Sequence, residues 1–304
     1  GQDKIDVSAW GITDFTQVQD LLYTDNHGDA TFNAYYNGFD HVMRIADVDI
    51  NDLTAADFTF AAGGPKNQTG TAFDDVLFGT TGDNTLNGGD GNDTLMGGDG
   101  NDTLIGGPGL DDYDGGNGKD TLSYAYSADE GVHVDLKKGF AEFSDGAREF
   151  ILSVENVVGS QVGDLLTGDG GNNRLDGQAG NDTLEGGGGK DKLIGGAGAD
   201  TLTGGGGKDI FVFDAISDSP ANNRDGITDF SSHDRIDLTG LEDSSNQVLH
   251  YIGNSAFSHT AGELQVTAFL GGSLVNVDIN GDGTADFSIS VSGSHVPGSG
   301  DFLI

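Results

Sequence analysis

The sequence predicts an all-β chain in which very short strands alternate with tight turns. Blocks of nine residues follow one another without a gap from Gly70 to Ser123 and again from Gly159 to Val212. Glycine accounts for 53 of the 304 residues, and each block carries one large apolar residue at its eighth position. A flexible Gly/Asp linker needs no register. Twelve blocks in a common register therefore indicate folded repeats.

Each block reads as one turn and one short strand. Most blocks are close to the pattern GGxGxDxLx. Glycines at positions 1, 2 and 4 permit positive φ angles and leave backbone carbonyls uncovered. The Leu, Tyr or Phe at position 8 points inward, so stacked blocks form a ladder with a thin apolar core. Such a core is too small to hold the chain together by itself.

The charge of the chain indicates that cations stabilise the stacked blocks. Asp and Glu number 50 against 13 Lys and Arg, a formal net charge of −37, and position 6 is Asp in ten blocks. A stacked row of carboxylates repels itself unless cations lie between the turns. With no cysteine in the chain, the oxygen donors favour Ca²⁺. The same charge argues against nucleic-acid binding and against an anionic membrane surface, and no apolar run is long enough to span a membrane.

The nonapeptides resemble the RTX calcium-binding repeats of secreted bacterial proteins. The resemblance implies a right-handed parallel β-roll or β-helix, here built from two six-turn sets and flanked by β-rich end domains. It also implies that Ca²⁺ lies between a turn and the turn two blocks later. One turn supplies the carbonyls of positions 2 and 4 and its Asp, and the other supplies the carbonyls of positions 1 and 3 and its Asp.

Carried over residue by residue, this scheme implies up to about eight ions in the two rolls. The side chains at position 6 are Asp75, Asn84, Asp93, Asp102, Asp111 and Asp120 in the first set, and Asp164, Asn173, Asp182, Asp191, Asp200 and Asp209 in the second. The implied carbonyl ligands are those of Gly89, Gly91, Gly98, Gly100, Gly106, Pro108, Gly115 and Asn117, and of Gln178, Gly180, Gly187, Gly189, Gly195, Ala197, Gly204 and Gly206. Pairs that use an Asn, or the first block of either set, are expected to be weaker. The firm sites join the blocks that start at Gly88 and Gly106, Gly97 and Gly115, Gly177 and Gly195, and Gly186 and Gly204.

The rest of the chain divides around the two sets. Residues 124–158 read as a β connecting segment between the rolls at 70–123 and 159–212. The stretches DIFVFDAISDS at 209–219 and DRIDL at 234–238 make residues 213–304 resemble the serralysin C-terminal domain and the R-modules of mannuronan C-5-epimerases. The N-terminal piece, residues 1–66, resembles the end of a preceding RTX-type module. We therefore expect any catalytic domain upstream of this chain.

One further loop offers oxygen ligands at alternate positions. Residues 278–286 read DINGDGTAD, as at the start of an EF-hand loop, but Ile289 stands where the bidentate Glu is expected. A polar hairpin turn is the alternative reading. The weaker candidate ligands are Asp278, Asn280, Asp282, Thr284 and Asp286.

No catalytic residues are predicted, because the chain contains neither HExxH nor GxSxG. The favoured function is a secreted, extracellular or cell-surface calcium-binding module. It folds on Ca²⁺ after export through a type I secretion apparatus and stabilises or carries a larger protein. The last residues, Asp301 to Ile304, resemble a type I secretion signal. The alternative is an extracellular polysaccharide-binding module, as in an alginate epimerase or lyase, with Lys137, Lys138 and Arg148 as the only cationic candidates.

Overall fold

A computed structural model describes residues 67–241 and 248–304, together with the backbone of five strands nearer the N-terminus. Of those five, β1 (Ile5–Asp6) and β5 (Phe58–Thr59) pair in parallel. The other three, β2 (Leu22–Thr24), β3 (Ala30–Tyr36) and β4 (Phe39–Ile45), form an antiparallel sheet. The expectation that residues 1–66 form the end of a preceding RTX-type module concerns a segment that, apart from these five strands, lies outside the described residues.

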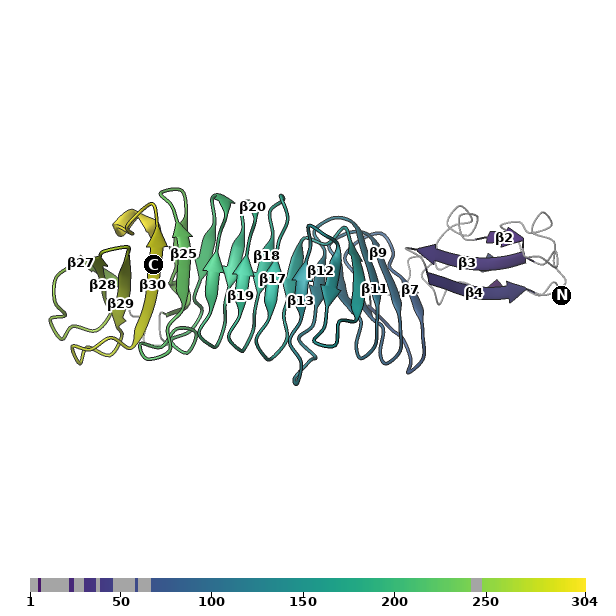
Figure 1. Cartoon of the computed structure of the whole chain (residues 1–304), viewed down its shortest axis with the longest axis horizontal. Coiled ribbons are helices and arrows are strands. Elements are labelled where there is room, and N and C mark those ends of the chain that lie inside the picture. Colours follow the sequence, from purple (N-terminus) through teal and green to yellow (C-terminus); the bar gives the residue numbers. More distant parts are fainter. Residues whose placement is uncertain are drawn as a thin grey trace. The chain divides into compact units, whose positions relative to one another are not determined.

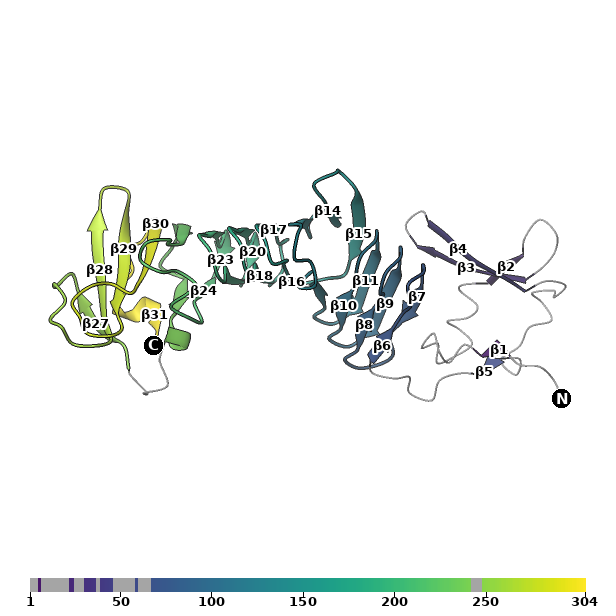
Figure 2. The same ribbon diagram turned by 90° about the horizontal axis from the view of Figure 1, so that it is seen from below.

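The chain divides into two compact units, which are described separately. The first contains residues 1–122 and 149–154, and the second contains residues 123–148 and 155–304. In the first unit two parallel sheets face each other, as Figures 1 and 2 show for the strands between β6 and β11. One sheet holds β6 (Asn67–Thr69), β8 (Thr85–Asn87), β10 (Thr103–Ile105) and β12 (Thr121–Ser123). The other holds β7 (Val76–Phe78), β9 (Thr94–Asp99), β11 (Asp112–Asn117) and β15 (Arg148–Leu152).

Consecutive nonapeptides alternate between the two sheets, so strands within a sheet are 18 residues apart. Thr85 is in register with Thr103, and Thr103 with Thr121. The three-residue strands occupy positions 7 to 9 of their blocks, and position 8 points inward. Leu86, Leu95 and Leu104 are fully buried. The all-β fold with parallel rolls is thus confirmed.

The second unit continues the same two-sheet design. One sheet runs through β16 (Asn156–Val158), β18 (Arg174–Asp176), β21 (Lys192–Ile194), β24 (Ile210–Val212), β26 (Arg235–Asp237) and β31 (Phe302–Leu303). The other begins with β14 (Phe140–Glu142), β13 (His133–Asp135), β17 (Leu165–Thr167), β19 (Thr183–Glu185), β22 (Thr201–Thr203) and β25 (Gly226–Phe230). A small pair, β20 (Gly188–Gly189) and β23 (Gly206–Gly207), joins two of the turns.

The C-terminal part extends the second sheet with longer antiparallel strands. These are β30 (Phe287–Gly293), β29 (Gly272–Asp278) and β28 (Glu263–Phe269), with β27 (His250–Gly253) parallel to β28 at the edge. The short 3-10 turns η4 (Thr239–Leu241) and η5 (Ser299–Asp301) flank the ends of the other sheet. At the C-terminus, β31 pairs in parallel with β26 and buries Phe302. Within the described residues, no helix has the length and hydropathy that a membrane span requires.

A hydrogen-bond ladder on the outside of the turns also holds the stack together. It uses the Asp or Asn at position 5 of a block, whose side chain accepts the backbone N–H of position 5 two blocks later. Asp74 Oδ1 accepts the N–H of Asn92 at 2.8 Å, and Asn92 Oδ1 accepts that of Leu110 at 3.0 Å. In the second roll, Asn172 holds Lys190 in the same way at 2.8 Å. This ladder needs no cation.

Candidate calcium-binding ladder

The position-6 side chains stand in columns inside the turns. In each column, the Oδ1 atom of an Asp accepts the backbone N–H of the position-6 residue two blocks earlier. Every pair expected from the sequence is brought together in this way. The donor and acceptor residues, separated by 2.7–3.0 Å, are Asp75 and Asp93, Asn84 and Asp102, Asp93 and Asp111, Asp102 and Asp120, Asp164 and Asp182, Asn173 and Asp191, Asp182 and Asp200, and Asp191 and Asp209.

The second carboxylate oxygen of many of these residues has no protein partner. It is buried without a hydrogen bond in Asp102, Asp182, Asp191, Asp200 and Asp209, and likewise in Asp225, which lies beyond the nonapeptides. A buried carboxylate oxygen that lacks both water and a donor is costly unless a cation binds it. Burial is also the largest influence on the acidity of these groups. It raises the pKa of Asp182 to about 8 and the pKa of Asp191 to about 6.

Glycine at position 1 keeps open the space beside the free oxygens of Asp102, Asp182, Asp191, Asp200 and Asp209. A Cβ atom on Gly186 would lie 2.6 Å from Asp191 Oδ2 and 2.7 Å from the carbonyl oxygen of Gly204, which opens the block two later. Gly97 has the same relation to Asp102 Oδ2 and the Gly115 carbonyl. Carboxylate and carbonyl oxygens from two turns thus converge on one point, with room for an ion rather than for a methyl group.

Position 2 of the turn requires a left-handed backbone. Gly187, Gly196 and Gly205 have φ angles of 96°, 89° and 87°. Gln178 takes the same position with a φ of 72°, one of the few positive φ values of non-glycine residues in the described ranges. A side chain in that conformation is strained. The turn geometry is therefore imposed by stacking even where glycine is absent.

The chemistry of these donors fits calcium. The converging atoms are carboxylate and carbonyl oxygens, the hard ligands that Ca²⁺ takes in flexible coordination shells. In the described part of the chain, no three His, Cys, Asp or Glu side chains gather at a single point. The position-6 side chains instead come together in pairs, of two acids or of one Asn and one acid, beside backbone carbonyls.

The first two blocks of each set differ from the later ones. There the position-6 side chain accepts hydrogen bonds from position 2 of its own block. Asp75 Oδ2 accepts the N–H and the hydroxyl of Thr71 at 2.6 and 2.8 Å, and Asp164 Oδ2 accepts the N–H of Ser160 at 2.7 Å. The amide oxygens of Asn84 and Asn173 accept the N–H groups of Thr80 and Asp169. These four side chains already accept hydrogen bonds from their own blocks, and the weaker sites expected there stay a prediction.

The column also extends beyond the nonapeptides, which the sequence reasoning missed. Asp225 Oδ1 accepts the N–H of Asp200 at 2.8 Å, and Asp234 Oδ1 accepts that of Asp209 at 3.0 Å. Burial raises the pKa of Asp225 to about 8 and also raises the pKa of nearby Asp218. The spacing here is 25 rather than 18 residues, because an extra loop after β24 interrupts the period. The motif Asp-x-Ile, at Asp225 and again at Asp234, was the signal available in the sequence.

The loop at 278–286 forms a hydrogen-bonded hairpin turn. Asp278 accepts the N–H groups of Gly281 and Gly283 at 2.7 and 2.8 Å, and Asp286 Oδ2 accepts the N–H of Ile279 at 2.9 Å. The Asn280 amide bonds to Asp286 Oδ1, and Asp282 Oδ1 accepts the N–H of Thr284. The loop's acids therefore point toward its own N–H groups, unlike the open carboxylates of the rolls.

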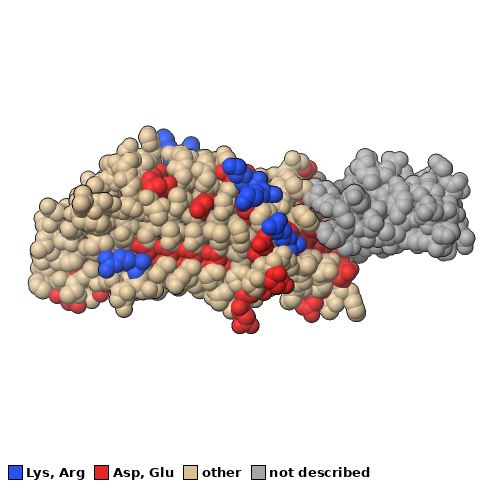
Figure 3. Space-filling model, in the orientation of Figure 1, with Lys and Arg blue, Asp and Glu red and all other residues tan. Residues whose placement is uncertain are grey.

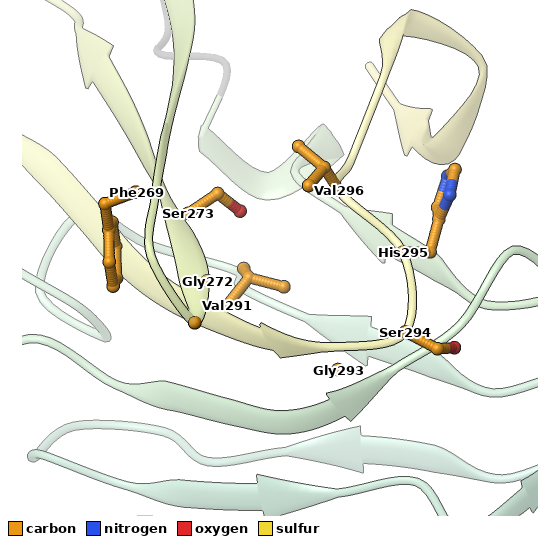
Figure 4. Close-up of a pocket in the computed structure, with 9 residues that line it drawn as sticks. Phe269, Gly272, Ser273, Val291, Gly293, Ser294, His295 and Val296 are labelled. Carbon is orange, nitrogen blue, oxygen red and sulfur yellow. The ribbon is translucent and has the colours of Figure 1, made fainter.

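Acidic residues outnumber basic ones in the chain, and a hollow lies apart from the turns. Figure 3 shows acidic side chains in a line along the second roll, with Lys and Arg in a few separate groups. The hollow, of about 250 Å³, lies where β29 begins and β30 ends (Figure 4). Ser273, Val291, His295 and Val296 border it, and His295 Nε2 lies 2.8 Å from Asp301 Oδ2. Because no acid lines the hollow, it is chemically distinct from the carboxylate columns.

Family models match both parts of the described chain. Residues 152–304, which make up 153 of the 304 residues, match the model described as the peptidase M10 serralysin C terminal. The chain belongs to the serralysin C-terminal family. In this serralysin-type chain, residues 69–104 and 88–122 match the RTX calcium-binding nonapeptide repeat. The chain therefore carries calcium-binding repeats of the kind found in secreted proteins, and the matched modules are not catalytic ones.

Solved structures give partial matches to this serralysin-type chain. The AlgE6R3 and AlgE6R2 subunits of the Azotobacter vinelandii mannuronan C5-epimerase are 29% and 28% identical, with TM-scores of 0.37 and 0.39. The matches cover 48% and 49% of this chain, and 80% and 92% of those subunits. The extracellular lipase LipA from Serratia marcescens is 18% identical, with a TM-score of 0.32, and the match covers 76% of this chain but 40% of the lipase. Among curated proteins, no relative matches the chain.

Proposed function

We propose that the chain is a calcium-dependent folding module of a secreted protein. In a cell, where free Ca²⁺ is scarce, the Asp columns keep the rolls unfolded. Outside, millimolar Ca²⁺ fills the columns and the rolls close, so that binding free energy becomes folding free energy. The observation that carries this proposal is the set of buried position-6 carboxylate oxygens without a hydrogen-bond partner, each beside a glycine that leaves room for an ion.

Electrostatics support the same conclusion. The formal charge of −37 opposes compaction, and the columns concentrate part of that charge in the core. Eight divalent ions, one for each expected pair, would reduce the formal charge to about −21. The ions would bind between the turns through the two acids and the carbonyls of positions 1 to 4. We propose the same role for Asp225 beside Asp200, beyond the last nonapeptide.

Calcium titration followed by far-UV circular dichroism tests the proposal. Residues 70–212 should be largely unstructured in a chelator and should gain β signal cooperatively as Ca²⁺ reaches the millimolar range. Mg²⁺ at the same concentration is the control, since it prefers six close ligands and retains its water. Equal β content with and without Ca²⁺ would refute the proposal.

The same module is suited to export in the unfolded state. The last residues contribute β31, whose Phe302 is buried once the sheet has formed. We propose that Asp301 to Ile304 are read by a type I secretion apparatus before folding and are packed against β26 afterwards. Deleting these four residues should abolish export. Normal export of the truncated chain would rule out the signal, whatever happens to calcium-induced folding.

A row of cations supports a second candidate function, the binding of an acidic polysaccharide. Two of the three cations considered from the sequence are engaged within the protein, since Lys138 pairs with Asp135 and Arg148 pairs with Glu142. Arg174, Lys192, Ile210 and Arg235 occupy the same register position on successive strands of one sheet. Of the three cations, Arg174 pairs with Asp176 and Arg235 pairs with Asp301. Such strands are about 4.8 Å apart. This spacing gives a line of three cations, interrupted at Ile210, in which Lys192 is the one without an acidic partner among the described residues.

Alginate serves as the probe for this second candidate. Retention of the calcium-loaded chain on an alginate gel should fall with added salt and with Lys192→Gln, while Lys119→Gln in the first roll should have no effect. Retention that is identical in the two variants would exclude the cationic row as the binding surface.

A further inference from the structure

Tyr113 interrupts the apolar column at the centre of the first roll. It takes position 8 of its block, where the neighbouring blocks have Leu104 and Leu122, and it is 2% exposed. Its hydroxyl group donates to Asp111 Oδ2 at 3.4 Å. A tyrosine in the thin core thus directs a polar group at the last Asp of one carboxylate column.

The hydroxyl group lies where other turns place a carbonyl oxygen. A Cβ atom on Gly88 would meet Asp93 Oδ2 and, at 2.7 Å, the carbonyl oxygen of Gly106, which opens the block two later. A Cβ atom on Gly106 would meet Asp111 Oδ2 and then the Tyr113 hydroxyl instead. The Tyr113 hydroxyl group therefore occupies the space beside Asp111 that corresponds to the expected calcium position beside Asp93, in the turn that opens at Gly88.

The chain beyond Asp111 also departs from the repeat. The next strand in this sheet is β15, with Asp112 in register with Phe150. Glu149 takes the place of the next position-6 Asp, because its Oε1 accepts the N–H of Asp111 at 3.2 Å. Glu149 is 1% exposed. Two buried acids thus follow one another along the column at this point.

We propose that Tyr113 ends the calcium column on this side of the first roll, its hydroxyl group replacing the ion that would otherwise bind beyond Asp111. The inference rests on the proposed calcium-dependent folding. On this view the ion between Asp93 and Asp111 is the last of its column. Asp111 is then neutralised by that ion on one side and satisfied by a hydrogen-bond donor on the other.

Counting the ions bound to each variant tests this role directly. Tyr113→Leu restores the residue usual at position 8 and opens Asp111 and Glu149 to a shared ion. Equilibrium dialysis with elemental analysis should find one more Ca²⁺ per folded chain than in the wild type. The matched control is Phe211→Leu, which removes a buried aromatic ring without a hydroxyl group from the second roll and should leave the ion count unchanged. An unchanged count in Tyr113→Leu would overturn the proposal.

A second variant keeps the test decisive if Tyr113→Leu fails to fold. Tyr113→Phe retains the ring and leaves no room for an ion, so the ion count should stay the same. The melting temperature in saturating Ca²⁺ should fall by about 5 °C, because a buried carboxylate loses its donor. An unchanged melting temperature would overturn the proposal. A wild-type chain that binds no Ca²⁺ would overturn the folding proposal as well, whereas binding with no effect of Tyr113 overturns this inference alone.

Discussion

Replacing Gly186 by alanine should close one calcium position of the second roll. The new Cβ atom would lie 2.6 Å from Asp191 Oδ2 and 2.7 Å from the Gly204 carbonyl oxygen, whereas ordinary contacts are 3.4–4 Å. Gly186 is not among the glycines with positive φ, so its φ angle is one that alanine also adopts. The methyl group therefore occupies the space between two expected ligands and displaces the ion.

The size of the effect follows from linkage between binding and folding. An ion held at 100 times its dissociation constant stabilises the folded state by about 2.7 kcal/mol. For a domain of 150–250 residues, that loss corresponds to a fall of about 5–10 °C in melting temperature. The number of bound ions should fall by one, and the calcium midpoint of folding should rise.

Gly206→Ala is the matched control. Gly206 lies two positions further along the partner turn and contributes a carbonyl to the same expected site, but a Cβ atom there meets nothing within 4 Å. Calorimetry and dialysis of the two variants at equal calcium concentration form the assay. If Gly186→Ala binds as many ions as Gly206→Ala, with the same melting temperature, the assignment of the ion to this space is wrong.

The carboxylates themselves give the remaining predictions. Asp182→Asn should raise the calcium midpoint of folding more than Asp75→Asn does, as measured by a circular-dichroism titration. Asp182 belongs to two of the expected pairs, whereas Asp75 Oδ2 already accepts a hydrogen bond from Thr71. Equal shifts in the two variants would contradict the sharing of ligands between neighbouring sites. Without calcium, β content should rise as the pH falls from about 8 toward 4. In the folded chain the pKa values of Asp182 and Asp225 are raised to about 8, above their values in the unfolded chain. Protonation of these groups therefore stabilises the fold at low pH, and this stabilisation is lost as the pH rises through about 8. A pH-independent spectrum in chelator would contradict this. Asp225→Asn should lower the dialysis ion count by one although Asp225 lies outside the nonapeptides, and an unchanged count would exclude Asp225 as a ligand.

The repeat could be interpreted from the sequence because the residues that form each turn lie within a single block of nine. Gly at position 1, Asp at position 6 and Leu at position 8 each meet one requirement of the turn, and each recurs at nine-residue intervals in most blocks. Once the period is fixed, the pairing of Asp182 with Asp200 follows from counting. The column of position-6 side chains can therefore be predicted from the sequence wherever the nine-residue period is uninterrupted.

The count fails where the chain departs from the period. Asp225 continues the column after a loop whose length no repeat dictates, so the 25-residue step to Asp200 appears only in the folded chain. Glu149 reaches Asp111 across 38 residues that include the β13–β14 hairpin. The role of Tyr113 was hidden for another reason, because its ring satisfies the apolar pattern while its hydroxyl group acts outside that pattern.

The constant 18-residue step between neighbouring strands has a kinetic consequence. Parallel sheets usually join distant segments and fold slowly, since loop closure must precede contact. In the rolls described here, Thr85, Thr103 and Thr121 meet partners only two blocks away, so contact order is low for a parallel β protein. We expect the conformational search to be short and the folding rate to follow the arrival of ions. Stopped-flow mixing with calcium would then give a rate that rises with calcium concentration and changes little with the number of repeats.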